Sequence, residues 1–406
     1  MTQVSSMKEF NIGKWLFTPY SITSSWIKDM MRKRSLLQLI VRTRCGVCTR
    51  LRVISAVTTV LLILGVGSIR CRAQTAGDTG PGDFPTERGP IPIRDSRPLN
   101  LLFLQFTPES GDVLKRNTNR YDLQLDVINN MQIPSPGSGS TVVEDNEYQR
   151  LRFAWRHGLP GKTEFALFVP LQWRNAGMLD GVISAYHHMM GLADNSLDVP
   201  LGMGAYPLYQ SKLQIIDSSG NVLLNRGNAF GFGESVMTLK REITPLSRRS
   251  AVAVRLGVKL PTGNVTEVMG SGHFDAGASL DARYSLGRNI SVYGNLGYVL
   301  LGTTNIAYGS RPNTVQSLAC LEYHPNSRDS FVLQVDGNGQ FVTTGNAFAD
   351  RSNVTATFGY RRKFDRCHVG YLSFSEGGHI ENYTMPSIGN ASPNFTVSMG
   401  LTWLQK

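Results

Sequence analysis

The chain has 406 residues, 17% of them charged, and a formal net charge of +11. That length fits either two soluble domains or one large barrel with a targeting segment. The charge is uneven: residues 1–73 hold 12 of the 41 basic residues and only 2 of the 30 acidic ones. The remainder has 29 basic and 28 acidic residues, without the excess of cations that a nucleic-acid-binding surface needs. We therefore expect no nucleic-acid partner.

Residues 1–73 read as a secretory leader. An uncharged, mostly apolar run over 54–69 follows four arginines and leads into the small-residue exit Cys71-Arg72-Ala73. The run is shorter than the about 20 residues of a spanning helix, which favours a signal peptide cleaved after Ala73 over an uncleaved anchor. The preface is long, so translation is expected to begin at Met30 or Met31.

Two segments separate this leader from the first patterned strand. Residues 74–97 are rich in Gly, Pro, Asp and Thr and predict a flexible linker. Residues 98–406 are then expected to form the folded domain. The stretch 97–106 is apolar but does not alternate, so it either pairs briefly with the sheet or enters the interior as a plug.

The folded part is patterned with a period of two. From Phe395 to Trp403 every second residue is apolar and the residues between are Thr, Ser and Gly, which predicts a strand with one apolar face. Nine residues is close to the about 9–11 that a tilted strand needs to cross a bilayer. The same test predicts twelve strands, the even number that single-chain bacterial barrels have. They lie near 121–127, 150–156, 165–173, 231–242, 250–260, 273–284, 289–300, 314–324, 330–337, 352–364, 367–377 and 394–404.

The connections between these strands alternate in length. Short connections follow the second, fourth, sixth, eighth and tenth strands. All the remaining connections are longer, and the longest is 174–230. Tight turns on one side and large loops on the other are typical of outer-membrane barrels. A soluble sandwich has no physical reason to produce this rhythm. Both ends of the barrel segment then fall on the short-turn side.

The charged residues of the strands predict which face is the interior. A Lys or Arg on the lipid face near the midplane costs about 2–4 kcal/mol, so charged positions must face inward. This interior is either a water-filled pathway or a salt-bridged filling that holds the barrel together. The expected lumen-lining residues are Asp122, Asp126, Arg150, Arg152, Arg156, Glu164, Lys240, Arg255, Lys259, Asp275, Asp281, Arg283, Glu322, Asp336 and Arg361.

The longest connection contains a candidate helix. Between Asp180, a possible N-cap, and Gly191, apolar residues recur with helical spacing. The apolar face narrows the barrel mouth or simply packs within the loop. The residues of this tentative constriction are Val182, Ile183, Tyr186, Met189 and Met190.

Catalytic and metal-binding patterns are weak. Adjacent His187 and His188 point about 100° apart on a helix and cannot grip one metal together. His368 with Thr357 is the one pair that could be cast in a hydrolase role, and a nucleophile elbow is lacking. We expect no cofactor, no metal and no enzymatic activity, with an outer-membrane lipid hydrolase as the remote alternative.

Several motifs together resemble a known family. They are Leu256-Gly-Val-Lys-Leu-Pro-Thr-Gly263, Gly270-Ser-Gly-His-Phe-Asp275, Arg97-Pro-Leu, the Leu179-Asp…Ile183…His187 stretch and Gln334-Val-Asp-Gly337. Over roughly residues 95–404 the chain resembles the Gram-negative family named domain of unknown function 3187. The resemblance implies an outer-membrane location and a barrel fold. It implies no substrate and no catalytic residues.

The sequence thus predicts an all-β protein: a transmembrane antiparallel β-barrel of about 12 strands with a short helix in the longest loop. The expected location is the cell outer membrane, with membrane lipid and unidentified small solutes as partners. Passive passage or uptake of small solutes is the leading function. A structural or surface-interaction barrel without conduction is the alternative, and the oligomeric state is left open.

Overall fold

The computed structural model describes residues 88–132, 140–177, 179–181, 185, 189, 209–244, 249–303, 309–346, 349–378 and 393–405. The expected leader and the first part of the expected linker lie outside these ranges and stay predictions. Among the described residues, no helix is long and apolar enough to cross a membrane.

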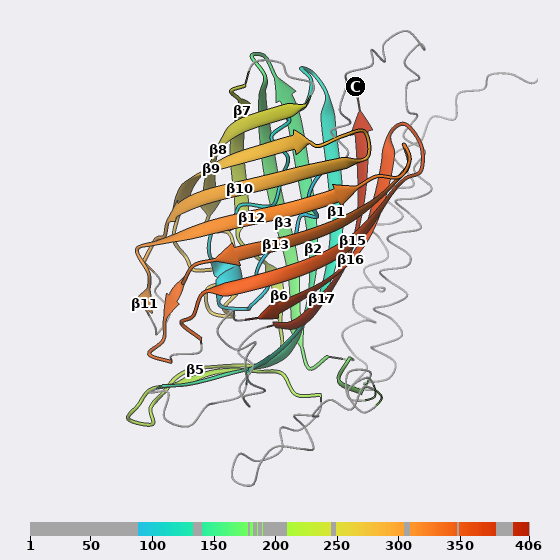
Figure 1. The fold of residues 1–406 in the computed structure, drawn as a ribbon. Helices are drawn as coiled ribbons and strands as arrows, with labels where there is room; N and C mark the ends of the chain where they lie inside the picture. The colour runs from blue at the N-terminus through green and yellow to red at the C-terminus, as the bar shows by residue number, and fades with distance from the viewer. Residues whose placement is uncertain are drawn as a thin grey trace, which may run out of the picture. The chain divides into compact units, whose positions relative to one another are not determined.

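Twelve antiparallel strands close into a barrel (Figure 1). Each strand pairs with the next along the ring, and β1 pairs with both β2 and β17, so the described sheet has no open edge among these twelve. At the seam, Tyr121 lies opposite Trp155 on one side and Trp403 on the other. The predicted fold class and strand number are confirmed. The strands are β1 (Asn119–Gln132), β2 (Thr141–Leu159), β3 (Thr163–Asn175), β7 (Ser235–Glu242), β8 (Ser250–Leu260), β9 (Asp275–Ser285), β10 (Ile290–Leu300), β12 (Asn313–Tyr323), β13 (Asp329–Asn338), β15 (Asn353–Lys363), β16 (His368–Gly378) and β17 (Pro393–Gln405).

Nine of the twelve strands begin and end within two residues of the expected bounds. The strands expected over 121–127 and 150–156 are longer, since β1 ends at Gln132 and β2 begins at Thr141. The strand expected over 231–242 is divided into β6 (Ala229–Phe232) and β7, which pair with successive parts of β3. The division lies opposite Pro170, which has no N–H to continue the ladder. Gly233 bridges it by donating its N–H to the Pro170 carbonyl at 2.9 Å.

Smaller elements lie in the long connections. The hairpin β4 (Lys212–Ile216) and β5 (Val222–Arg226) extends the sheet from the first residues of β2, Thr141–Asp145. Two short strands, β11 (Gly309–Ser310) and β14 (Val342–Thr343), join the loops after β10 and β13. We call the end of the barrel that carries these connections the long-loop end. The other end, where β1 begins and β17 ends, is the short-turn end.

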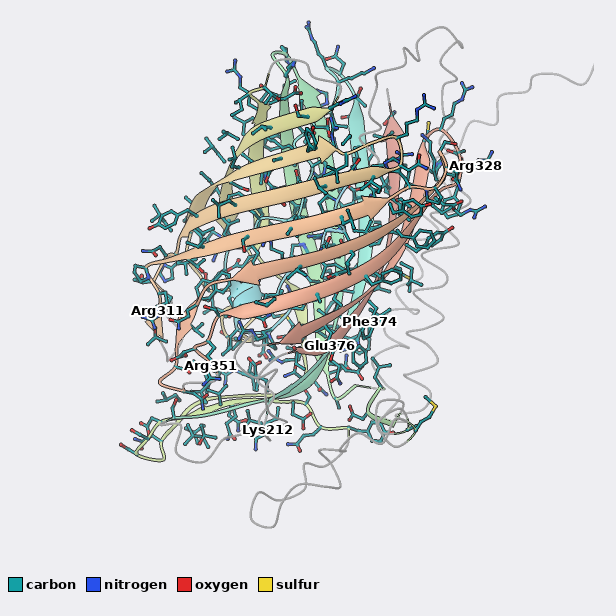
Figure 2. The ribbon with its side chains drawn as sticks, viewed as in Figure 1. Lys212, Arg311, Arg328, Arg351, Phe374 and Glu376 are labelled. Atoms are coloured by element: carbon teal, nitrogen blue, oxygen red, sulfur yellow. The ribbon has the colours of Figure 1, made fainter. Side chains whose placement is uncertain are left out.

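The two faces of the barrel wall have opposite chemistry. Along β12 the exposed side chains include Val315, Leu321 and Tyr323, while Gln316 and Glu322 are fully buried. A soluble protein buries its apolar side chains, whereas here the exposed face is the apolar one. Figure 2 shows these outward side chains around the wall, with Phe374 of β16 labelled.

The chain that precedes β1 lies inside the barrel. We call residues 88–118 the plug (Figure 1, the blue to cyan trace within the strands). It enters near the β12–β13 turn, where Arg88 donates to the Asn326 carbonyl at 3.4 Å. It reaches the short helix η1 (Asn100–Leu102) and returns to the short-turn end, where the Leu114 N–H donates to Glu164 of β3 at 2.9 Å.

This arrangement decides between the two alternatives for 97–106: the segment enters the interior as part of a plug. Residues 88–97, the described part of the expected linker, share that interior. Near the long-loop end the plug adds its apolar side chains to a core with the surrounding loops. That core contains Leu99, Leu102, Phe103, Leu104 and Phe106 of the plug, together with Val142, Leu213, Ile215, Leu224, Val268, Val299, Leu301, Phe341, Val342 and Ala349.

Candidate functional site

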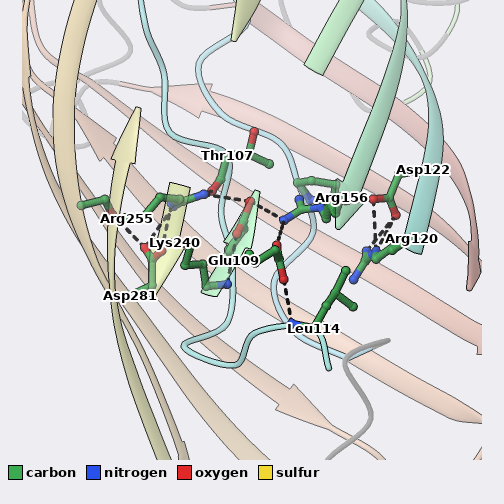
Figure 3. Close-up of polar contacts among 12 residues, drawn as sticks. Thr107, Glu109, Leu114, Arg120, Asp122, Arg156, Lys240, Arg255 and Asp281 are labelled. Atoms are coloured by element: carbon green, nitrogen blue, oxygen red, sulfur yellow. Dashed lines mark hydrogen bonds and ion pairs between the residues drawn. The ribbon is translucent and has the colours of Figure 1, made fainter. Parts of the chain in front are cut away.

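The centre of the plug is held by one carboxylate. Glu109 Oε1 lies 2.7 Å from Arg156 Nη1 and 2.8 Å from Arg255 Nη1, and Oε2 lies 3.2 Å from Lys240 Nζ (Figure 3). These cations come from β2, β8 and β7, so one side chain ties the plug to both sides of the β3 strand. Burial by itself would raise the pKa of the Glu109 carboxyl. The three cations outweigh burial and hold that pKa below its usual range.

Two of these cations also have partners on the wall. Arg255 Nε lies 2.9 Å from Asp281 Oδ2, and Arg156 Nη1 lies 3.2 Å from Glu164 Oε1. Within the described part of the chain, Lys240 makes its one ion pair with Glu109. We call Glu109, its three cations and the wall carboxylates Glu164 and Asp281 the hub. Its cations and carboxylates are equal in number only while Glu109 of the plug is in place.

Buried amides of the wall hold the plug backbone. The Ile91 N–H donates to Gln334 Oε1 at 2.9 Å, and Gln334 Nε2 donates to the Ile91 carbonyl at 3.1 Å. Asn295 makes the same pair of bonds with Glu109: its Oδ1 accepts the Glu109 N–H at 3.1 Å, and its Nδ2 donates to the Glu109 carbonyl at 2.8 Å. Each amide satisfies both backbone groups of one plug residue, as a neighbouring strand would.

The middle of the plug is also fixed by shape. Gln316 accepts the Phe106 N–H at 2.9 Å and donates to the Leu104 carbonyl at 2.8 Å. The Phe106 ring then lies against a wall without side chains, and Arg255 stacks over it at 5.1 Å from the ring centroid. A Cβ added to any of three inward-facing glycines would come within 3.1 Å of that ring. These glycines are Gly257, Gly277 and Gly297.

The family motif builds the support at the long-loop end. Glu234 accepts the N–H groups of Gly263 at 2.9 Å and Ser271 at 2.6 Å, joining the two halves of the motif. Lys259 donates to the Leu102 carbonyl of the plug at 2.8 Å and lies 3.2 Å from Asp275. The motif thus positions the turn of the plug, which is a role that its spacing did not reveal.

The expected lumen-lining residues lie inside the barrel wall and differ in what they contact. Whether they border a solute path stays a prediction. Nine contact the plug through hydrogen bonds or ion pairs: Arg152, Arg156, Lys240, Arg255, Lys259, Asp275, Arg283, Glu322 and Arg361. Glu164 also accepts a plug N–H. Four others bond to residues of the wall, namely Asp122, Asp126, Asp281 and Asp336. Arg150 bonds to none of the residues that the structure describes.

Sequence reasoning missed Glu109 and the amides Gln316, Gln334 and Asn295. Glu109 lies in a segment without strand periodicity, so the inward-facing rule could not reach it. The amides are uncharged, and a rule based on the cost of charge in lipid passes over them. Their signal was a large amide at an inward position of an otherwise regular strand.

Other sequence candidates are not brought into this site. Of the expected loop-helix constriction, Val182, Ile183, Tyr186 and Met190 lie outside the described residues, and Met189 has an exposed side chain. The constriction therefore stays a prediction.

The one pair considered for hydrolase chemistry is not assembled. His368 is the first residue of β16 and lies 2.8 Å from Asp365, whereas Thr357 bonds to Ser375, seven residues farther along β16. The described ranges contain no group of three or more His, Cys, Asp or Glu residues placed to hold a metal ion.

Two small cavities remain between the plug and the wall. One of about 60 Å³ lies among Pro108, Arg120, Asp122 and Arg156, and one of about 50 Å³ lies among Arg94, Asp126 and Arg150. Both are bordered by Pro92, Pro108 and Arg152, so they adjoin along the inner face of β1 and β2. Space of this size holds a few water molecules.

The chain was compared with known proteins and their structures. Similar solved structures include the COG4313 outer membrane channel from Pseudomonas putida F1 (10% identity, TM-score 0.49, 74% of this chain and 100% of that one). The NanC porin has 10% identity and a TM-score of 0.38, with 70% and 98% covered. The CymD monoaromatic hydrocarbon channel has 11% identity and a TM-score of 0.35, with 72% and 89% covered. Likeness at this level carries no argument about function.

The search of curated proteins finds no match. A family model, by contrast, matches residues 82–403, which include the plug, its motif support and every strand of the barrel. The chain belongs to the family described as protein of unknown function (DUF3187).

Proposed function

We propose that this protein is an outer-membrane barrel that passes small solutes through its lumen when the plug moves. The observation that carries the proposal is the hub at Glu109, where a polar interior is closed by a segment held through ion pairs and hydrogen bonds. Water can replace such contacts one by one, whereas a dry apolar core resists hydration. The part of the plug that is held in this way is suited to move and return, whereas its apolar core at the long-loop end resists hydration.

The membrane part of the proposal rests on the outer face of the wall. Outward positions of β8 from Val252 to Leu260 carry only apolar side chains, and β9 and β10 continue this surface. Aromatic side chains gather toward the short-turn end, where Tyr121 stacks on Trp403 at 5.3 Å and Phe331 lies 5.4 Å from Tyr360. An apolar band with an aromatic border is what a bilayer and its interface select.

The two cavities between plug and wall are too small to pass a solute, so we take passage to require movement of the plug. The cavities of about 60 and 50 Å³ admit water but no solute of several heavy atoms. The barrel without conduction is the competing function, and the dense contacts of the plug favour it. A test must therefore separate a plug that moves from one that never does.

A reversible disulfide between plug and wall distinguishes a plug that moves from one that does not. A Cβ added at Gly359 would lie 2.7 Å from Ile91 Cγ1, the position that a cysteine sulfur would occupy at residue 91. Ile91→Cys with Gly359→Cys, in a Cys320→Ala background, should therefore form a disulfide between plug and wall. The measurement is solute flux into proteoliposomes and conductance in planar bilayers, with and without reductant.

Flux that is present when reduced and lost when oxidised supports gating by the plug. Flux that is equal in both states would show that solutes pass without plug movement. A barrel that is silent in both states, although gel mobility shows it folded, would support the non-conducting alternative. The Cys320→Ala parent controls for any effect of oxidant alone.

A further inference from the structure

The inner face of β2 carries a column of arginines. Arg150, Arg152 and Arg156 all face inward, at every second residue apart from one alanine. Inward positions on one strand recur about every 7 Å, so these guanidinium groups are spaced along the lumen axis. The arginine nearest the short-turn end, Arg156, is neutralised by Glu109 and Glu164. The other two are not.

Arg152 lies over the Phe168 ring, 5.8 Å from its centroid, and among the described residues it donates hydrogen bonds only to uncharged oxygen atoms. It donates to Thr107 Oγ1 at 3.2 Å, to the Pro92 carbonyl at 2.6 Å and to the side-chain oxygen of Gln124. Arg150 has neither a hydrogen bond nor an ion pair with any residue that the structure describes, and its Nε is buried without a partner. Two neighbouring cations therefore point into the lumen without a bound counter-charge.

The nearest carboxylate does not cancel them. Asp126 acts on Arg150 through its charge, but its Oδ1 already accepts hydrogen bonds from Ser398 and Gln124, both at 2.6 Å. One carboxylate among two guanidinium groups leaves a net positive charge. In a low-dielectric surrounding, such a charge is costly unless an anion joins it.

The free space lies where these cations are. The two cavities meet at Arg152, and the second extends to Arg150. The first is also bordered by six cations and four carboxylates: Arg88, Arg120, Arg152, Arg156, Lys240 and Arg361 against Glu109, Asp112, Asp122 and Glu164. The second is bordered by three cations and three carboxylates: Arg94, Arg150 and Arg152 against Asp95, Asp126 and Glu234. Over the two cavities together, cations outnumber carboxylates by one.

We infer that Arg150 and Arg152 form an anion site on the solute path, and that the path takes small solutes bearing a carboxylate. The planar fork of a guanidinium group matches the two oxygens of a carboxylate, and two forks in line pass such a group from one to the next. The inference rests on the proposed function, since it names the class of solute that the lumen conducts.

The test measures ion selectivity and anion binding separately. Reversal potentials under a potassium chloride gradient are compared for the wild type, Arg150→Gln with Arg152→Gln, and the charge-keeping Arg150→Lys with Arg152→Lys. Arg288→Gln is the matched control, because Arg288 is an exposed arginine in the short β9–β10 turn. Melting of each folded barrel is followed in sodium formate, the smallest carboxylate, and in sodium chloride of equal ionic strength.

We expect the wild type to prefer chloride over potassium. Loss of both charges should lower the permeability ratio about tenfold, by Coulomb interaction across a water-filled lumen. The lysine pair and Arg288→Gln should keep the ratio, and formate should raise the melting temperature only where the charges remain.

A barrel that conducts with the same ratio in all four proteins overturns the anion path. A folded barrel that does not conduct would overturn the proposed function instead. The melting temperatures in the two salts then show whether the anion site exists. If formate raises the melting temperature of the wild type but not of the glutamine pair, the anion site stands without a path. Equal melting temperatures in both salts would overturn the site as well.

Discussion

Replacing Glu109 with glutamine should release the plug. The change removes one negative charge that lies 2.7 Å from Arg156, 2.8 Å from Arg255 and 3.2 Å from Lys240. Arg156 keeps Glu164 and Arg255 keeps Asp281, both within 3.2 Å. Lys240 is left buried without an acidic partner among the described residues.

The size of the effect follows from that single unpaired cation. Breaking a buried ion pair by removing one partner costs about 3–5 kcal/mol. The glutamine oxygen still accepts one hydrogen bond, so we take about 3 kcal/mol, which is about a hundredfold in the ratio of released to docked plug. Because the barrel strands pair without the plug, their own stability should change little.

Hydrogen exchange measures the released fraction directly. The plug amides at Ile91, Leu104 and Glu109 donate to wall side chains, so their exchange should speed up about a hundredfold, with β9 and β10 as internal reference. Glu242→Gln is the control, since Glu242 pairs at 3.0 Å with Lys162, whose side chain is 40% exposed. Such a pair contributes at most about 1 kcal/mol.

A second substitution checks the mechanism. Adding Lys240→Met to Glu109→Gln removes the orphaned cation and should restore part of the protection. Plug amides that exchange as slowly in Glu109→Gln as in Glu242→Gln would refute the hub. Equal exchange with and without Lys240→Met would show that the unpaired cation is not the cause.

Further predictions concern pH, shape and the outer loop. The pKa of the Glu109 carboxyl is lowered in the folded protein, so its stabilisation is complete above the unfolded pKa of about 4.3 and is lost only as pH falls through the lower folded value. Protection of the Glu109 amide, corrected for the intrinsic pH dependence of exchange, should therefore be the same at about pH 7 and about pH 5, and a loss of protection in that window would contradict the assignment. Gly111→Ala places a Cβ 2.3 Å from the Ala251 carbonyl and should speed plug exchange at a cost of about 1–3 kcal/mol. Gly287→Ala meets nothing within 4 Å and should leave exchange unchanged. Phe106→Ala empties the ring's place against the three glycines and should weaken docking of the plug by about 3–5 kcal/mol, read from the same amides. Deleting 178–192 should raise conductance if the expected loop helix narrows the mouth, whereas unchanged conductance would favour simple loop packing.

The barrel itself could be predicted because the polarity of each wall side chain shows whether it faces the lipid or the interior. Along β8, Val254, Leu256 and Val258 face outward while Arg255 and Lys259 face inward. This alternation is local, so a short window of sequence is enough to find a strand and assign its faces. The lengths of the connections then fix which strand ends lie together. Twelve strands, antiparallel order and a charged interior all follow from such windows.

The plug could not be predicted in the same way, because its contacts have no period and its partners are far along the chain. Ile91 meets Gln334 across 243 residues, and Glu109 meets Lys240 across 131. Pattern shows whether a residue faces lipid or the interior, but it does not show which interior groups meet. Only closure of the ring brings Arg156, Lys240 and Arg255 around one point, and only then does a carboxylate from the segment before β1 have a place to bind. The sequence by itself thus determined the wall, and the tertiary structure decided what fills it.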